Sequence, residues 1–175
     1  QTLEGYPVAS YFLYKMDGII QSPEDVTNHY TEVVQPDGSI KNIVLQPDAK
    51  PGDIRFKDLN NDGVIDENDK EYCGSGIPKL EANLSFGGSY KGVDLSFLLG
   101  SAWGHKLYNA NRLYYESMDA GINLFKSTLG AWTEDNRSNV MPRAVLKDPN
   151  MNSRESDRFL EKGNFIRLRQ LQVGY

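Results

Sequence analysis

The stretch NLSFGGSYKGVDLSFLL, residues 83–99, alternates apolar and small polar side chains on both sides of a two-residue break. Its apolar face is formed by Leu84, Phe86, Gly88, Tyr90, Val93, Leu95, Phe97 and Leu99. A period of two is typical of β-strands with one apolar face. Lys91-Gly92 has the length of a tight hairpin turn. Tyr90 and Val93 flank this turn and should pair, so the two apolar faces coincide.

This hairpin fits two all-β architectures. In a β-sandwich the apolar face packs into the core. In an outer-membrane β-barrel the apolar face contacts lipid and the polar face lines the lumen. The alternation does not distinguish them. The sequence has no run of about 18 apolar residues, so a transmembrane helix is not expected.

Residues 159–175 predict a further long strand in which the apolar face changes parity. The apolar side chains of its two halves are Ile166 and Leu168, then Leu171, Val173 and Tyr175. A one-residue slip near Gln170 would return them to a single face, so we predict a β-bulge there. Residues 104–158 separate this strand from the hairpin. Loops of such length are usually functional.

Residues 1–80 are richer in turn signals and are expected to form a region separate from residues 81–175. The run PVASYFLYKMDGIIQ, residues 7–21, predicts one or two short strands around an Asp17-Gly18 turn. Ser22-Pro23-Glu24-Asp25 predicts the first turn of a short helix with Ser22 as its N-cap. Residues 40–45 predict another strand.

The segment DLNNDGVIDEND, residues 58–69, matches the template of an EF-hand calcium loop. The expected oxygen ligands, at loop positions 1, 3, 5, 7, 9 and 12, come from Asp58, Asn60, Asp62, the Val64 carbonyl, Asp66 and Asp69. Gly63 occupies the sharp turn, and Ile65 should anchor the loop on apolar neighbours. Asp69 replaces the usual bidentate Glu, which favours weak binding, about 10⁻⁴–10⁻³ M as in extracellular modules. The alternative is an acidic turn that binds no ion.

Composition excludes several other functions. The net charge of −5 argues against nucleic-acid binding. Cys73 is the single cysteine, which excludes an intrachain disulfide and a Cys-based zinc site, so we expect an idle thiol. His29 and His105 have no partners at metal-binding spacing and should be packing or surface residues. Large aromatic side chains are expected to pack rather than bind sugar. Since no catalytic constellation is present, we expect a protein that is not an enzyme.

Five segments, in order along the chain, resemble the SusC/RagA family of TonB-linked outer-membrane transporters. They are GYP with SYFLYKMDGIIQS (5–7 and 10–22), PGDIRFKDLNNDGVIDENDKEYCGSGIPKL (51–80), NLSFGGSYKGVDLSFLLGSAWGHKLYN (83–109), AWTEDNRSNVMPRA (131–144) and SDRFLEKGNFIRLRQLQVGY (156–175). The resemblance implies a barrel of about 22 strands with an N-terminal plug. It also implies import of glycans or peptides with a SusD-like surface lipoprotein as lid, powered by TonB–ExbB–ExbD.

On this resemblance, the chain is a late portion of the barrel in the bacterial outer membrane. The expected fold is all-β, a partial antiparallel transmembrane β-barrel segment with long extracellular loops and an EF-hand-like calcium loop. Strands 83–90, 93–103 and 159–175 would contact lipid, with loop 104–158 outside and the Lys91-Gly92 turn in the periplasm. Tyr90 would join an aromatic girdle, and Arg167 and Arg169 would face the lumen. The alternative is a soluble secreted calcium-binding β module that binds glycans or mediates adhesion.

Overall fold

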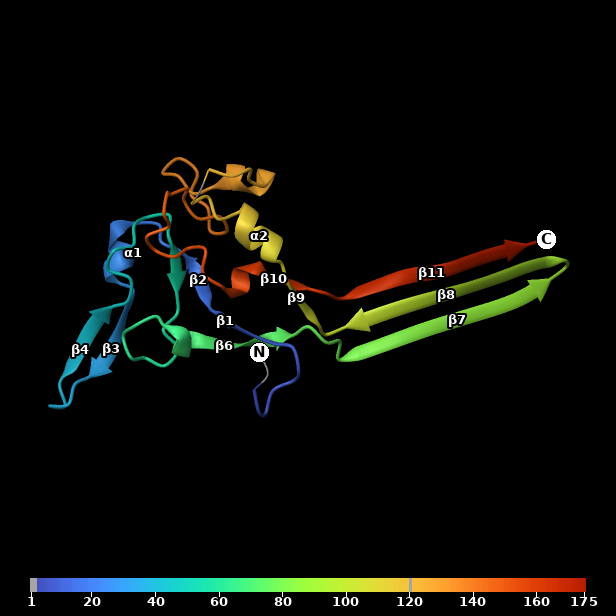
Figure 1. Ribbon diagram of the computed structural model, residues 1–175, viewed down its shortest axis with the longest axis horizontal. Helices are drawn as coiled ribbons and strands as arrows, with labels where there is room; N and C mark the ends of the chain where they lie inside the picture. The colour runs from blue at the N-terminus through green and yellow to red at the C-terminus, as the bar shows by residue number, and fades with distance from the viewer. Residues whose placement is uncertain (1–2, 120) are drawn as a thin grey trace. The chain divides into compact units, whose positions relative to one another are not determined.

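The computed structural model describes residues 3–119 and 121–175 (Figure 1). It consists of antiparallel β-sheets with two short α-helices and three 3₁₀ turns in the described residues. Two compact units are present, one of residues 3–11, 74–108 and 160–175, the other of residues 12–73, 109–119 and 121–159. The chain leaves the first unit twice and returns to it, and the expected boundary at residue 80 stays a prediction. In the described residues no helix has the length and apolarity needed to cross a membrane.

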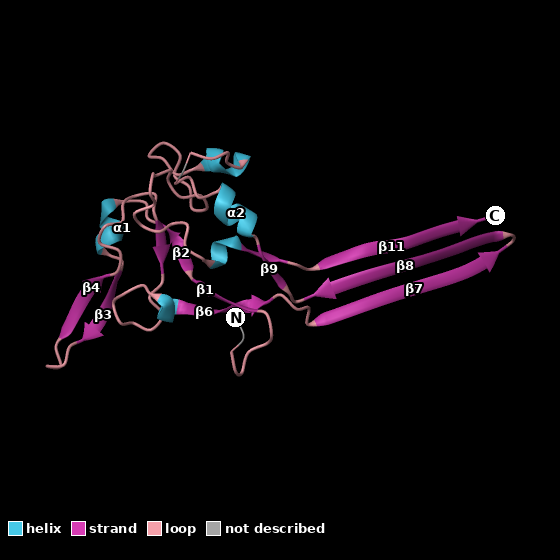
Figure 2. Cartoon of the chain, viewed as in Figure 1, coloured by secondary structure: helices cyan, strands magenta, loops and turns pink. Residues whose placement is uncertain are grey.

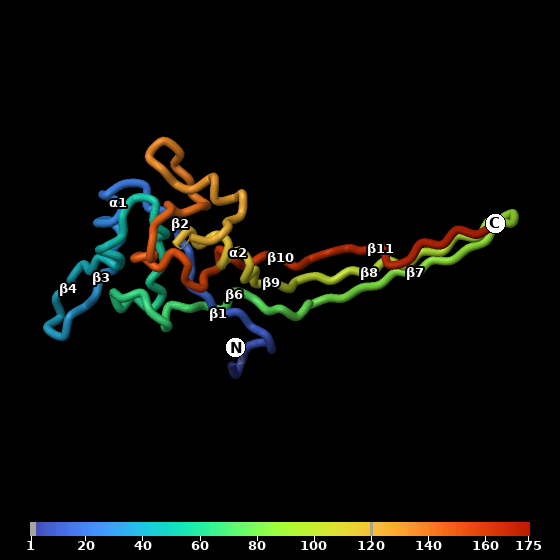
Figure 3. Tube along the Cα trace, turned by 45° about the horizontal axis from the view of Figure 1, so that its top comes forward, coloured from blue at the N-terminus to red at the C-terminus, as the bar shows by residue number. Residues whose placement is uncertain are grey.

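The first unit contains a three-stranded sheet of long strands (Figure 2). Its order is β11 (Phe165–Gly174), β8 (Val93–Trp103) and β7 (Leu80–Tyr90), and the strands run side by side in a second view (Figure 3). Tyr90 pairs with Val93, as predicted. Lys91 and Gly92 have φ angles of 51° and 82°, the two positive values that a type I′ hairpin turn needs.

The predicted β-bulge in β11 is confirmed. The register with β8 shifts between Leu168 and Gln170, so Arg169 is the extra residue. Leu168 pairs with Leu99, and Leu171 pairs with Phe97. Since Leu99 and Phe97 lie on the same face of β8, the bulge returns the second half of β11 to the apolar face.

The expected continuous strand over residues 159–175 is interrupted. Phe159 ends a 3₁₀ turn, η3 (Asp157–Phe159), and β10 (Leu160–Lys162) pairs with β9 (Lys106–Tyr108) before β11 begins. Gly163 separates β10 from β11, and its N–H donates to the His105 carbonyl over 3.0 Å. The His105 ring occupies the space that a side chain at residue 163 would need. The break is thus fixed by a contact with a distant residue.

The remaining strands form two-stranded sheets: β1 (Ser10–Tyr14) with β6 (Lys70–Ser75), β2 (Met16–Ile19) with β5 (Ile54–Phe56), and β3 (Tyr30–Val34) with β4 (Ile40–Val44). The predicted Asp17-Gly18 turn is wrong. Both residues lie within β2, where the register against β5 shifts and Gly18 has a φ of 106°. Glycine supplies the positive φ of a bulge here instead of a hairpin turn.

The helix predicted from Ser22 is confirmed as α1 (Pro23–Thr27), with Ser22 and Asp25 forming a reciprocal capping box. The long connection contains α2 (Ala110–Tyr115) and the 3₁₀ turn η2 (Lys126–Gly130), and the turn η3 begins at its end. The core of the second unit centres on Tyr14, Ile54 and Phe56, which lie on β1 and β5.

Candidate functional site

The three-stranded sheet has one apolar face that is largely exposed. Large side chains of this face are Leu84, Phe86, Tyr90, Val93, Leu95, Ile166, Leu168, Leu171 and Val173. Their exposed fractions range from 39% to 73%, although residues of these types are usually buried. Phe86 and Phe97 stack across the strand pair with ring centroids 5.4 Å apart. A continuous exposed face of this kind requires an apolar partner.

The opposite face of the sheet is polar. Its side chains include Asn83, Ser85, Ser89, Asp94, Ser96, Gln170 and Gln172. Arg167 pairs with Gly100 and therefore lies on this face. The guanidinium of Arg169 covers Gly100, since a Cβ built there would lie 2.5 Å from the Arg169 Nε. The sheet thus separates an apolar surface from one that carries two arginines.

The acidic loop, residues 58–69, turns around Gly63, which has a φ of +87°. The Asp58 carboxylate accepts hydrogen bonds from the backbone N–H groups of Asn61 (2.7 Å) and Gly63 (2.9 Å). The Asp62 carboxylate accepts from the Val64 N–H (2.9 Å) and from the Asn60 amide (2.7 Å). These carboxylates therefore organise the turn through its own backbone.

Asp69 closes the loop from inside. It is fully buried, and its Oδ1 and Oδ2 accept from the N–H groups of Leu59 and Asp66, each over 2.8 Å. Asp66 in turn caps the 3₁₀ turn η1 (Glu67–Asp69) by accepting from the Asn68 N–H. Ile65 packs against the core cluster, as predicted. The two ends of the loop are thereby fastened to each other and to the core.

The donor set of this loop fits a hard cation in its chemistry. Carboxylate, amide and carbonyl oxygens are the ligands that calcium prefers, and a carboxylate oxygen with one hydrogen bond retains a further lone pair. Within residues 3–119 and 121–175, however, no three His, Cys, Asp or Glu side chains are grouped as a metal cluster. Asp58, Asn60 and Asp62 lie around the turn, whereas Asp69 is turned into the protein and held by backbone N–H groups.

A lysine stabilises the C-terminal end of the loop. The Lys70 ammonium lies 2.7 Å from the Glu67 carboxylate and 5.0 Å from the centre of the Tyr14 ring. The hydrogen bond from Lys70 lowers the pKa of Glu67. Burial raises the pKa of Tyr14, and its hydrogen bond to Glu67 adds to that shift. These contacts join the loop to β1.

The structure also contains buried polar clusters that the sequence did not reveal. Asp53 is fully buried, and its partners include Arg143 and the Asn152 amide, which donates over 3.0 Å. Glu116, on the long connection, is also buried and forms ion pairs with Arg112 (3.2 Å) and Arg158 (3.1 Å). Arg112 and Glu116 are only four residues apart, whereas the pairs Glu116–Arg158 and Asp53–Arg143 join distant positions and follow no local sequence pattern.

Comparisons with known proteins connect this architecture to one group. No protein-family model matches the sequence. TonB-dependent receptor P3 of Formosa agariphila is 24% identical over 98% of the chain, and TonB-dependent receptor SusC of Bacteroides thetaiotaomicron is 28% identical over 75% of it. The chain spans 15% and 12% of the lengths of these two relatives.

The fold is also found in a solved structure. The RagAB peptide importer in its closed-closed state matches 99% of the chain with a TM-score of 0.58 and 18% sequence identity. The chain covers 18% of the matching RagAB chain. The relatives are named receptors and an importer, not enzymes.

Proposed function

Because this chain is similar to a segment of the SusC/RagA-like TonB-dependent transporters, we propose that it forms part of the wall and outer loops of an outer-membrane importer. The observation that carries this proposal is the sheet β11-β8-β7, with an exposed apolar face and a polar face. Lipid would cover the apolar face, and the lumen would hydrate Arg167 and Arg169.

The orientation follows from the lengths of the connections. Turns of such barrels are short on the periplasmic side and long on the outside. Lys91-Gly92 would therefore be periplasmic, and residues 104–158 and the acidic loop would be extracellular. The outer segments would contact the cargo, a glycan or peptide, and a SusD-like lipoprotein that closes over it. Energy would come from TonB–ExbB–ExbD through parts of the transporter outside this segment.

We further propose that the acidic loop binds calcium as a structural ion. Asp58, Asn60, Asp62, the Val64 carbonyl and Asp66 would supply ligands, and Asp69 would complete the set. The bound ion would offset the repulsion among the loop carboxylates. Support comes from the turn at Gly63 and from the anchoring of Ile65 and Asp69, which bring the loop ends together.

The competing function is a soluble secreted calcium-binding β module for glycan binding or adhesion. In water, this function requires another protein surface that covers the apolar face of β7, β8 and β11. Detergent dependence separates the two, because a lipid-facing sheet remains in solution only when an amphiphile covers it.

The full-length parent protein should be expressed in a Gram-negative host and its fractions compared. We expect it in the outer membrane, extractable only with detergent. Uptake of a labelled glycan or oligopeptide should require an intact TonB system. A parent protein that is monomeric and soluble without detergent would overturn the proposal.

A further inference from the structure

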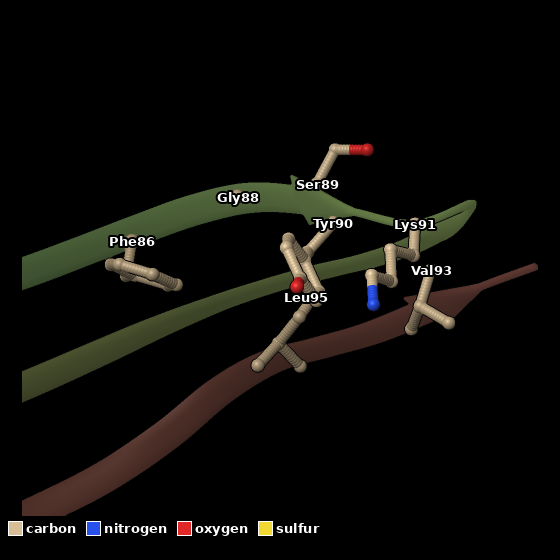
Figure 4. Close-up of a pocket in the computed structure, with 7 residues that line it drawn as sticks. All are labelled: Phe86, Gly88, Ser89, Tyr90, Lys91, Val93 and Leu95. Carbon is tan, nitrogen blue, oxygen red and sulfur yellow. The ribbon is translucent and has the colours of Figure 1, made fainter.

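A groove of about 540 Å³ lies at the hairpin end of the apolar face (Figure 4). It is lined by Phe86, Gly88, Ser89, Tyr90, Lys91, Val93 and Leu95. Gly88 pairs with Leu95 and has no side chain, so it leaves a gap between Phe86 and Tyr90 on β7. A Cβ on Gly88 would lie 3.4 Å from the Phe86 ring, in ordinary van der Waals contact, so the space above Gly88 accommodates a methyl group beside that ring.

One end of this groove is positively charged. The Lys91 ammonium lies 5.3 Å from the centre of the Tyr90 ring. Figure 4 shows the side chains of Lys91, Tyr90 and Leu95 on the same side of the sheet, with the Ser89 hydroxyl on the other. Within the described part of the chain, Lys91 has no carboxylate partner. The groove therefore combines an apolar floor with an unneutralised cation and a phenol.

We propose that this groove is a binding site for a phospholipid with an anionic headgroup. The phosphate would accept hydrogen bonds from the Lys91 ammonium and the Tyr90 hydroxyl. One acyl chain would lie over Gly88, between Phe86 and Leu95. This assignment rests on the proposed membrane location, but it adds a ligand and a headgroup charge.

Charge complementarity selects this occupant. A lysine near an anionic bilayer surface gains about 1 kcal/mol, whereas an uncharged amphiphile gains nothing from it. Burial of an acyl chain accounts for the apolar side chains Phe86, Val93 and Leu95 in the groove, and the absent side chain at Gly88 makes room for the chain. A protein partner would neutralise the Lys91 charge only if it supplied a carboxylate at this position.

The chain offers a substitution that removes the charge without weakening the turn. Lys91→Asn creates Asn-Gly, the preferred pair for a type I′ turn. Gly88→Val fills the groove, and Gly87→Val places the same side chain on the opposite face, where nothing lies within 4 Å of the new Cβ. Lys41→Asn removes a lysine from β4, outside this unit.

The full-length transporter should be reconstituted in phosphatidylethanolamine vesicles that contain a minor fraction of diazirine-labelled phosphatidylglycerol. Mass spectrometry then measures cross-linking within residues 80–103 relative to residues 165–174. We expect Lys91→Asn to lower this ratio about fivefold, since one lysine–headgroup contact is lost. Gly88→Val should also lower it, and Gly87→Val and Lys41→Asn should leave it unchanged. Unlabelled phosphatidylglycerol should compete better than phosphatidylethanolamine.

Equal cross-linking in Lys91→Asn and the unmodified protein would overturn the inference, as would equal competition by the two lipids. Folded barrels migrate differently from heat-denatured ones on gels, so the assembly of each variant is checked first. If the parent protein does not enter a membrane, the proposed function fails. If it inserts but the labelling does not depend on Lys91, only the lipid site fails.

Discussion

Arg143 forms a two-point ion pair with Asp53, with Nε donating to Oδ1 over 2.7 Å and Nη2 donating to Oδ2 over 3.1 Å. Asp53 is fully buried, and the Lys50 N–H also donates to its Oδ2. Asn152 donates to Asp53 and accepts from the Ile54 N–H over 2.7 Å. Two positions of the long connection are thereby fixed to the segment that leads into β5.

Replacing Arg143 by Met should destabilise the second unit. The substitution leaves the Asp53 carboxylate buried without its cation, which costs about 3–5 kcal/mol. Hydrogen exchange of the full-length protein in detergent should show loss of protection over residues 50–56 and 143–152. Arg137→Met, at an exposed position of the same connection, is the matched control. Unchanged protection in Arg143→Met would show that the ion pair contributes little.

The features that the sequence predicted are those whose residues lie close together along the chain. The Lys91-Gly92 turn, the Ser22 capping box and the bulge near Gln170 each depend on a few neighbouring residues or on parity. Pairs such as Asp53 and Arg143 depend on how distant parts of the chain come together, which the alternation of side chains along a strand does not predict. The partner of Asp53 is an arginine 90 positions further along the chain.

Because β11 has one apolar and one polar face, two neighbouring substitutions should have different effects on assembly. Leu171 pairs with Phe97 on the apolar face, and Gln172 pairs with Ser96 on the polar face. Leu171→Arg should impair assembly, since an arginine facing lipid at the bilayer midplane costs about 2–4 kcal/mol. Gln172→Arg should assemble normally. The yield of heat-modifiable folded barrel measures both.

This pair of variants also tests the bulge. Without the extra residue Arg169, the parity of the strand would place Leu171 in the lumen and Gln172 in lipid. If Gln172→Arg lowered the yield of folded barrel more than Leu171→Arg does, the two faces of β11 would be the reverse of those assigned. An equal loss of folded barrel in both variants would indicate a strand that is buried on both sides.

Calcium should bind the acidic loop with a dissociation constant of about 10⁻⁴–10⁻³ M. Calorimetric titration of the folded full-length protein measures this directly, and Asp62→Asn should weaken binding because it removes one ligand charge. Asp48→Asn, an exposed acid outside the loop, should not. Asp69 is unsuitable for this comparison, because it supports the backbone of Leu59 and Asp66.

Removal of calcium has a structural consequence that can be measured separately. Chelation should lower hydrogen-exchange protection over residues 58–69, where carboxylates then repel each other, and restored calcium should return it. If calcium titration gives no heat and hydrogen exchange over the loop does not respond to chelation, the loop binds no calcium. It is then an acidic turn held by its own hydrogen bonds. The Asp58 and Asp69 contacts to backbone N–H groups already describe such a turn.

His29 should make the second unit less stable as the pH falls. Burial lowers the pKa of His29, and the nearby Arg55 guanidinium lowers it further, against the opposing effect of Asp17. Its Nδ1 is buried and has no hydrogen-bond partner in the described part of the chain. The unfolded chain, with a histidine pKa of about 6.5, therefore binds more protons than the folded chain. The resulting stability is fully present above about pH 6.5 and decreases as the pH falls below it.

Hydrogen exchange over residues 28–45, corrected for the intrinsic effect of pH, measures this dependence in the full-length protein between pH 7.5 and 5.5. Protection should decrease across this range in the unmodified protein and remain nearly level in His29→Gln, because glutamine has no proton to gain. The range from pH 5.5 to 7.5 lies above the pH at which carboxylates usually titrate. Acids such as Asp17 therefore contribute little to the change of protection with pH. The same decrease in His29→Gln would assign the pH dependence to another group, and protection that increases as the pH falls would contradict the lowered pKa.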